Sequence, residues 1–211
     1  MRRLPVYLVL DTSASMQGEP IAAVRRGVKT LIDTLRTDPY ALETAFLSII
    51  TFNTNAHLAM PLTELMSFKE PDLNASGCTA LGEALELLSV KSDIDVIKTD
   101  QNVKGDWKPL VFIMTDGAPT DDYRYGLAEF KKRKFGMVVA CAAGRNANIN
   151  VLKKITDNVV QLETADSRTI SAFFKWVSAS VSTSSMKIES GAETGLLSEL
   201  PPPPPEINVV I

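Results

Sequence analysis

The sequence has few of the residues from which soft-metal sites, disulfides and histidine-based catalysis are built. Among its 211 residues there are one histidine, His57, and two cysteines, Cys78 and Cys141. A zinc site usually needs about four cysteine or histidine ligands, more than this chain can supply. Two cysteines are also too few for a disulfide framework. We therefore expect Cys78 to be a partly buried free thiol, Cys141 to be a small core residue, and the protein to be cytoplasmic, in a reducing compartment.

The chain also lacks a strong excess of one charge and a long apolar run. Its 22 basic and 25 acidic residues give a formal net charge of −3, which argues against a nucleic-acid partner. No apolar stretch is long enough to span a bilayer, and the first residues lack the hydrophobic region of a signal peptide. Because 45% of the residues are hydrophobic, we expect a packed domain without a membrane span.

Two common functional loops are missing as well. No G-x-G-x-x-G follows the first predicted strand, which argues against dinucleotide binding, and no G-x-S-x-G surrounds Ser13 or Ser15. A phosphatase of the haloacid-dehalogenase type would use Asp11, but it normally has a second acid where this chain has Ser13. We expect a binding protein and no enzyme. A Mg²⁺-dependent hydrolase or phosphatase acting through Asp11 is the alternative.

The first strong pattern in the sequence is a continuous apolar run, Leu4–Leu10, followed directly by oxygen-bearing side chains. Such a run predicts a strand buried on both faces, as in a parallel sheet. Asp11, Ser13 and Ser15 follow at alternate positions. They are expected at the carboxyl end of the strand, which is where open α/β sheets bind ligands. Carboxylate and hydroxyl oxygens suit a hard cation such as Mg²⁺ or Ca²⁺.

Two later segments repeat this arrangement. Thr79 stands just before a helical pattern, and Asp116 directly follows the apolar run Leu110–Thr115. A D-x-S-x-S string alone is a weak signal, because Asp and Ser are common in turns and helix caps. In a parallel sheet, however, strand ends and helix starts meet at one edge. The three segments together therefore predict one cluster of oxygen ligands.

The strings DTSAS, GCT and TDG, in this order and spacing, resemble the von Willebrand factor A domain family. The resemblance covers roughly the first 180 residues and implies a metal-ion-dependent adhesion site formed by Asp11, Ser13, Ser15, Thr79 and Asp116. The stretches DTSASMQGEPI and FIMTDGAPTD are most similar to small bacterial proteins of this family that are linked to tellurium resistance. That similarity implies a cytoplasmic stress-response scaffold that works with a kinase and a phosphatase.

The resemblance also implies how such a site works. We expect Ser13 and Ser15 to bind the metal directly and Thr79 to bind it directly or through one water. Asp11 and Asp116 are expected to accept hydrogen bonds from metal-bound water. Mg²⁺ is the expected divalent cation, with Mn²⁺ or Ca²⁺ as alternatives. In this family an acidic residue of a protein partner fills the open coordination position, so a partner's Asp or Glu is the expected ligand.

Strand patterns alternate with helical patterns along the chain, which predicts βαβ units. We expect an α/β, Rossmann-like, doubly wound fold: a mainly parallel six-stranded sheet with one antiparallel edge strand and helices on both faces. The predicted strands are Leu4–Leu10, Thr44–Phe52, Ala56–Leu62 (the antiparallel edge), Leu110–Thr115, Gly136–Ala142 and Val159–Leu162. Pro39 is expected to stop the first helix. Asp121 and Asp122 are expected to cap a helix, with a place at the rim of the metal site as the alternative.

The composition changes near the end of the sequence. We place a von Willebrand factor A-type domain at residues 1–183 and a Ser/Pro-rich C-terminal tail at residues 184–211. Pro201–Pro205 predict a stiff polyproline II segment, and Ile207–Ile211 are apolar again. Packing of this tail on its own domain is the simplest expectation. Binding to a partner's groove or to a neighbouring sheet edge is the alternative.

Overall fold

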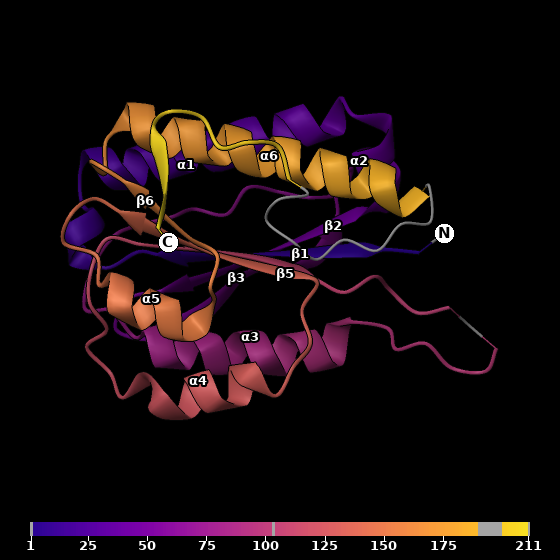
Figure 1. Cartoon of the computed structure of the whole chain (residues 1–211), viewed down its shortest axis with the longest axis horizontal. Helices are drawn as coiled ribbons and strands as arrows, with labels where there is room; N and C mark the ends of the chain where they lie inside the picture. Colours follow the sequence, from indigo (N-terminus) through magenta and orange to yellow (C-terminus); the bar gives the residue numbers. More distant parts are fainter. Residues whose placement is uncertain (1, 103, 190–199, 211) are drawn as a thin grey trace.

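The centre of the protein is a mixed β-sheet with a layer of helices on each face, as a computed structural model shows (Figure 1). The structure describes residues 2–102, 104–189 and 200–210. Its strands are β1 (Leu4–Asp11), β2 (Ala45–Phe52), β3 (Ala56–Glu64), β4 (Leu110–Thr115), β5 (Met137–Ala143), β6 (Val159–Leu162) and β7 (Ile207–Val210). They lie in the order β3-β2-β1-β4-β5-β6-β7.

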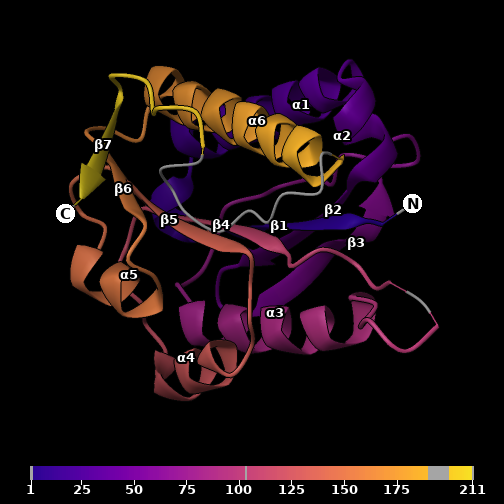
Figure 2. The same ribbon diagram turned by 45° about the vertical axis from the view of Figure 1, so that its right-hand side comes forward.

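The helices divide between the two faces of the sheet (Figures 1 and 2). One layer contains α1 (Glu19–Arg36), α2 (Pro39–Thr44) and α6 (Ser167–Glu189), and the other contains α3 (Leu81–Asp95), α4 (Tyr123–Lys131) and α5 (Ile149–Ile155). A single 3-10 turn, η1 (Ala14–Met16), follows β1. The expected α/β fold class with helices on both faces is confirmed.

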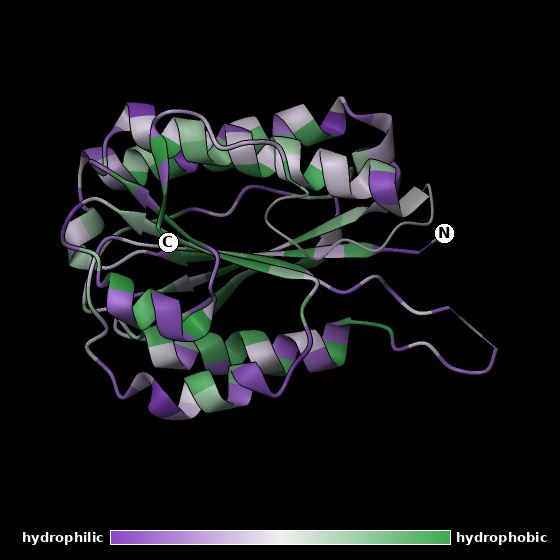
Figure 3. Ribbon diagram, in the orientation of Figure 1, coloured by the Kyte–Doolittle hydropathy of each residue, from purple (hydrophilic) through white to green (hydrophobic). Residues whose placement is uncertain are grey.

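The apolar sequence of β1 explains why this strand lies in the middle of the sheet. All eight of its residues are buried. Val6, Leu8 and Leu10 belong to the hydrophobic cluster under α1 and α6, whereas Tyr7 and Val9 belong to the cluster under α3 and α5. Successive side chains of a strand point to opposite faces, so a run without polar residues fits only where both faces are covered. Figure 3 shows the strands mainly in the hydrophobic colour.

The pairing of the strands brings the predicted site segments to one edge. β1 is parallel to both β2 and β4, and Val6 pairs with Leu110. β1 and β4 are therefore neighbours, as the sequence predicts, and Asp11 and Asp116 leave the sheet at the same end. β3 pairs antiparallel with β2, which confirms the predicted edge strand.

Close packing of helices α1 and α6 depends on a residue without a side chain. A methyl group placed on Gly27 of α1 would lie 2.2 Å from Cδ2 of Phe174 in α6. Phe174 is fully buried, so its ring has no free space into which it can move. α6 can therefore pack directly against α1, and both cover the same half of the sheet.

The structure differs from the sequence expectations in two elements. The sheet has seven strands instead of six, because β7 of the tail pairs antiparallel with β6. Pro39 does not simply follow a helix end: it opens α2, whose N-cap Asp38 accepts hydrogen bonds from the N–H groups of Tyr40 and Ala41. The expected division into a domain at residues 1–183 and a tail at 184–211 stays a prediction: residue 183 lies within the span of α6, and residues 190–199 and 211 of the expected tail lie outside the described residues.

Candidate metal centre

Asp11 is the most deeply buried carboxylate of the predicted site. It is the last residue of β1 and is 1% exposed. Its Oδ1 accepts the backbone N–H of Ser13 at 2.8 Å, and its Oδ2 accepts the hydroxyl of Thr115 at 2.5 Å. Both oxygens are thus held in place by donors from two neighbouring strand ends.

A chain of hydroxyl groups links the loop after β1 to the loop after β4. The Oγ atoms of Ser13 and Ser15 are 2.9 Å apart. The Ser15 hydroxyl in turn donates to Asp116 Oδ1 at 2.7 Å. Together with Asp11, these three residues form one cluster, although the two loops are about 100 positions apart in the sequence. Ser13 and Asp116 are buried, whereas Ser15 is exposed, so the cluster opens to solvent on the Ser15 side.

Thr79 reaches the same place from the segment before α3. Its side chain is 6% exposed. A methyl group placed on Gly117 would lie 3.7 Å from Thr79 Oγ1, so the hydroxyl lies beside the residue that follows Asp116. The structure thus brings all five predicted site residues to one edge of the sheet. Their role as metal ligands stays a prediction.

Backbone hydrogen bonds hold the three loops together. The N–H of Ala14 donates to the Gly77 carbonyl at 3.1 Å, and the N–H of Ser76 donates to the Thr12 carbonyl at 2.9 Å. Thr79 accepts from the N–H of Thr120 at 2.9 Å through its carbonyl. The hydroxyls are therefore positioned before any ligand arrives, which lowers the entropic cost of binding.

The two carboxylates are in an unfavourable electrostatic setting. Burial raises the pKa of Asp11, and the charge of Asp116 raises it further, although the hydrogen bonds from Ser13 and Thr115 lower it. Burial likewise raises the pKa of Asp116, against the hydrogen bond from Ser15. Two buried anions in one cluster favour a cation between them.

The chemistry of the donors fits a hard divalent cation. All five side chains offer oxygen, and the two carboxylates match a charge of +2. Within residues 2–102, 104–189 and 200–210, no three histidine, cysteine, aspartate or glutamate side chains group together in a way that could hold a metal. A site here must therefore use hydroxyl ligands. Cys78, next to Thr79, is exposed rather than partly buried as expected.

Asp121 and Asp122 act as helix caps. Asp122 is the N-cap of α4 and accepts the N–H of Arg124 at 3.2 Å. Asp121 accepts the N–H of Glu83 at 3.0 Å and so caps the first turn of α3, a different helix. Both contacts agree with the predicted capping role.

Thr115 is a site residue that the sequence analysis did not identify. Its hydroxyl is buried and fixes Asp11 Oδ2. The available signal was its position next to Asp116 at the end of a buried strand. Nothing in the sequence shows, however, that its hydroxyl faces Asp11.

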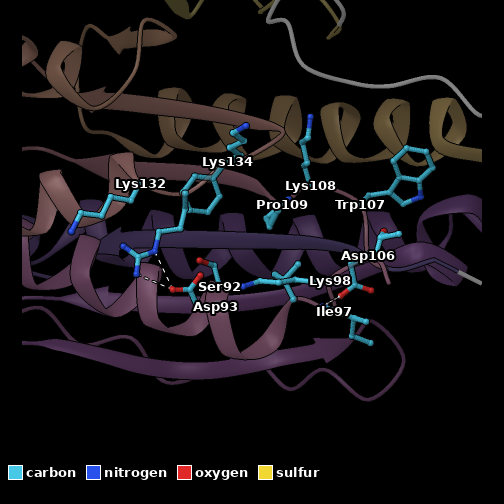
Figure 4. Close-up of a pocket in the computed structure, with 14 residues that line it drawn as sticks. Ser92, Asp93, Ile97, Lys98, Asp106, Trp107, Lys108, Pro109, Lys132 and Lys134 are labelled. Atoms are coloured by element: carbon cyan, nitrogen blue, oxygen red, sulfur yellow. Dashed lines mark hydrogen bonds and ion pairs between the residues drawn. The ribbon is translucent and has the colours of Figure 1, made fainter. Parts of the chain in front are cut away.

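A cavity lies at the other end of the parallel strands, beside Pro109, which precedes β4 (Figure 4). This cavity of about 360 Å³ is lined by several cationic side chains, among them Lys98, Lys108 and Arg133. Arg133 donates to Asp93 at 2.8 Å. The cavity lies at the C-terminal ends of α3 and α4, where cations offset the negative end of the helix dipole. We therefore assign these charges a structural role.

The fold and the oxygen cluster define a class: an α/β domain with a hydroxyl-rich site at the carboxyl edge of its parallel strands. The family model of the von Willebrand factor type A domain matches residues 6–175. The chain therefore belongs to this family. None of the helices in the described part combines the length and apolar character that crossing a bilayer requires.

Solved structures of the same fold come from a mussel and from bacteria. A von Willebrand factor type A protein from Catenulispora acidiphila is 19% identical over 86% of this chain and 43% of its own, with a TM-score of 0.66. Proximal thread matrix protein 1 from the mussel byssus, with a zinc-occupied MIDAS motif, is 18% identical over 84% and 48%, with a TM-score of 0.61. Protein BatB from Bacteroides thetaiotaomicron is 17% identical over 90% and 100%, with a TM-score of 0.55.

These similarities show the fold. The chain spans less than half of the length of the Catenulispora and mussel proteins. The comparison with curated proteins gave no match.

Proposed function

We propose that this chain is a metal-dependent protein-binding module. Asp11, Ser13, Ser15, Thr79 and Asp116 hold a divalent cation, Mg²⁺ first and Mn²⁺ or Ca²⁺ as alternatives. The observation that carries the proposal is the hydrogen-bonded chain from Ser13 through Ser15 to Asp116, which joins two strand ends around buried carboxylates. A bound cation would supply a Lewis-acidic anchor for an external oxygen ligand.

The partner in this proposal is a protein that donates an Asp or Glu side chain. Three neutral hydroxyls and two carboxylates leave an octahedral ion incompletely enclosed when some of them act through water. Ser15, on the solvent side of the cluster, is exposed. A carboxylate approaching there would make a charge-assisted contact with the cation.

Metal binding is tested first, by calorimetry with MgCl₂ and MnCl₂. Asp11→Ala and Ser13→Ala should abolish binding while circular dichroism shows an intact fold, and direct Mg–O distances in a metal-bound crystal should be about 2.1 Å. Thr30→Ala is the matched control, because Thr30 is an exposed residue in the second half of α1 whose hydroxyl donates to the Arg26 carbonyl. Undiminished affinity in both Asp11→Ala and Ser13→Ala would show that the ligand assignment is wrong.

Partner binding is tested by capture from a native lysate with Mg²⁺ and then with EDTA. Loss of a partner carboxylate contact costs about 2–5 kcal/mol, or roughly 30-fold to several-thousand-fold in affinity. Chelation or Thr79→Ala should therefore release the captured protein, and added Mg²⁺ or Mn²⁺ should restore its binding to the wild type. Binding that survives both EDTA and Thr79→Ala contradicts a metal bridge.

That the chain is not an enzyme is part of the same proposal. The alternative, a Mg²⁺-dependent hydrolase or phosphatase acting through Asp11, predicts turnover of generic phosphatase or esterase substrates. Turnover that disappears in Asp11→Ala would favour the enzyme.

We further propose a cytoplasmic stress-response setting linked to tellurium resistance, with a kinase and a phosphatase as further partners. Support comes from the amino-acid sequences of the two segments proposed to bind metal, DTSASMQGEPI and FIMTDGAPTD. The division into a domain at residues 1–183 and a tail at 184–211 also stays a proposal.

A further inference from the structure

The C-terminal strap, residues 200–210, lies across the outer end of the sheet and over α6 (Figure 2). It follows the segment matched by the family model, which ends at residue 175. Its strand β7 pairs with β6 from Leu162 opposite Ile207 to Val159 opposite Val210. The strap therefore occupies a sheet edge that would otherwise present unpaired backbone groups.

Side chains fix the strap at three further points. The indole N–H of Trp176 in α6 donates to the Pro201 carbonyl at 2.8 Å. Arg168 donates to Glu206 Oε1 at 2.9 Å. Leu200 and Ile207 are 8% and 4% exposed and belong to the hydrophobic cluster under α1 and α6.

These are the contacts by which proteins recognise separate peptides. Adding a strand to a sheet edge supplies main-chain hydrogen bonds, and a proline-rich segment docks on an aromatic surface that hydrogen-bonds its carbonyl groups. All of the contacts come from residues 200–210 themselves. A separate peptide with the same side chains can therefore make them.

The surface is also larger than the strap that lies on it. A groove of about 720 Å³ remains between the strap prolines and α6, beside Ser171, Ala172 and Lys175. Lys175 is exposed, and the Arg168 side chain is 80% exposed. The groove thus combines apolar walls with two accessible cations, which suits an extended ligand that carries acidic side chains.

We propose that the surface formed by α6 and the outer edge of β6 is a peptide-binding site, and that residues 200–210 occupy it as an internal ligand. The external ligand is an extended segment of a partner protein with prolines, then an acidic residue, then a short β-strand. Neither α6 nor β6 contributes one of the five proposed metal ligands, so this site works without the cation.

The test uses the full-length chain and a fluorescent synthetic peptide with the sequence of residues 200–210, in the presence of EDTA. The variant Glu206→Arg weakens the strap without changing a core residue, because it places a cation opposite Arg168. An internal ligand competes at an effective concentration in the millimolar range. Glu206→Arg should therefore bind the peptide about 10-fold or more tightly than the wild type, measured by fluorescence anisotropy.

Two controls locate the binding. In the double variant Glu206→Arg/Ile207→Asn, whose strap no longer competes, Trp176→Phe removes the indole donor but keeps a ring, and should weaken peptide binding about 10-fold. A peptide with Lys and Asn in place of its Glu and Ile should not bind. Ile207→Asn, which weakens the strap through its buried residue, should reproduce the gain of Glu206→Arg if circular dichroism shows that it is folded.

Equal peptide affinity in wild type and Glu206→Arg, or binding that Trp176→Phe leaves unchanged, would overturn the proposal. So would the absence of binding to folded Glu206→Arg. A wild-type dimer in light scattering that the peptide dissociates would assign the site to the strap of a second copy, and would overturn the assignment to a partner protein. Because EDTA is present throughout, failure here says nothing against the metal centre.

Discussion

At the scale of single residues, the proposed metal centre depends on groups that do not themselves have to touch the cation. Thr115 donates its hydroxyl to Asp11 Oδ2 and is 2% exposed. Without this donor, the hydrogen bonds that hold Asp11 come from Ser13 alone. Thr115 therefore orients a carboxylate that, in the proposed metal centre, accepts hydrogen bonds from metal-bound water.

We predict that Thr115→Val weakens Mg²⁺ binding by about 10- to 100-fold, the usual effect of losing a group that orients a metal ligand. Valine has nearly the same shape, but it leaves the buried Asp11 Oδ2 without its donor, so the melting temperature without metal should fall by a few degrees while the protein stays folded. Thr44→Val, at another buried threonine whose hydroxyl donates to the Tyr40 carbonyl, is the matched control. Calorimetry that finds equal affinity in wild type and Thr115→Val would refute this role.

The residues of the cluster could be named from the sequence because each stands directly at the end of an apolar run or the start of a helical one. Parallel strands bring such positions to one edge whatever their separation in the chain. The role of Thr115 could not be predicted, because it depends on the angle at which β4 meets β1. Exposure of Cys78 depends in the same way on how the loop before α3 is folded.

At the scale of the helix, α6 begins at a strong cap. Asp166 accepts the hydroxyl of Thr164 at 2.6 Å and the N–H groups of Arg168 and Thr169 at 2.9 and 3.0 Å. These hydrogen bonds hold the pKa of Asp166 below its usual range. Ionised Asp166 therefore stabilises the folded state at neutral pH, and this contribution is lost as the pH falls through the folded pKa.

We predict that Asp166→Ala lowers the free energy of unfolding by about 1 kcal/mol at pH 7. The difference from wild type should narrow as the pH falls below about 4, the ordinary pKa of an aspartate. Urea unfolding at several pH values measures both effects. Asp72→Ala, at an exposed position in the loop before α3, should show neither. A difference that stays constant down to acid pH would exclude the ionised cap.

Two elements of the fold, α2 and β7, are not among the elements predicted from the sequence. The pair Asp38-Pro39 is a helix-start signal, an N-cap followed by proline at the first helical position. The same pair also marks the end of α1, so the short helix α2 does not stand out in the sequence. β7 is a run of four residues after five prolines. Its sequence permits a strand. Its pairing with β6, however, also depends on the contacts of the strap with α6, which the sequence does not show.

At the scale of the whole molecule, a cation that binds only the folded state must raise its stability. At a free concentration of 100 times Kd, the gain is about 2.7 kcal/mol. For a chain of this size, that corresponds to a rise in Tm of roughly 5–10 °C. We predict this rise on adding Mg²⁺ and its reversal by EDTA.

The same scan with Asp116→Asn should show no rise, because this variant loses one of the two carboxylates of the cluster. Calorimetric or fluorescence melting curves are sufficient. A rise of equal size in Asp116→Asn would place the stabilising cation elsewhere on the protein.

The strand order also determines when each strand can find its neighbour during synthesis. Synthesis delivers β1, β2 and β3 first. β4 then adds to the other side of β1, and β5 and β6 each add beside the strand before them. Thr115, the end of β4, lies 104 positions after Asp11. At roughly 5–20 residues per second, the nascent chain waits on the order of 5–20 s for it. During that interval the edge of β1 that later pairs with β4 is open, and this strand is apolar on both faces. It is the segment for which a chaperone at the ribosome would compete.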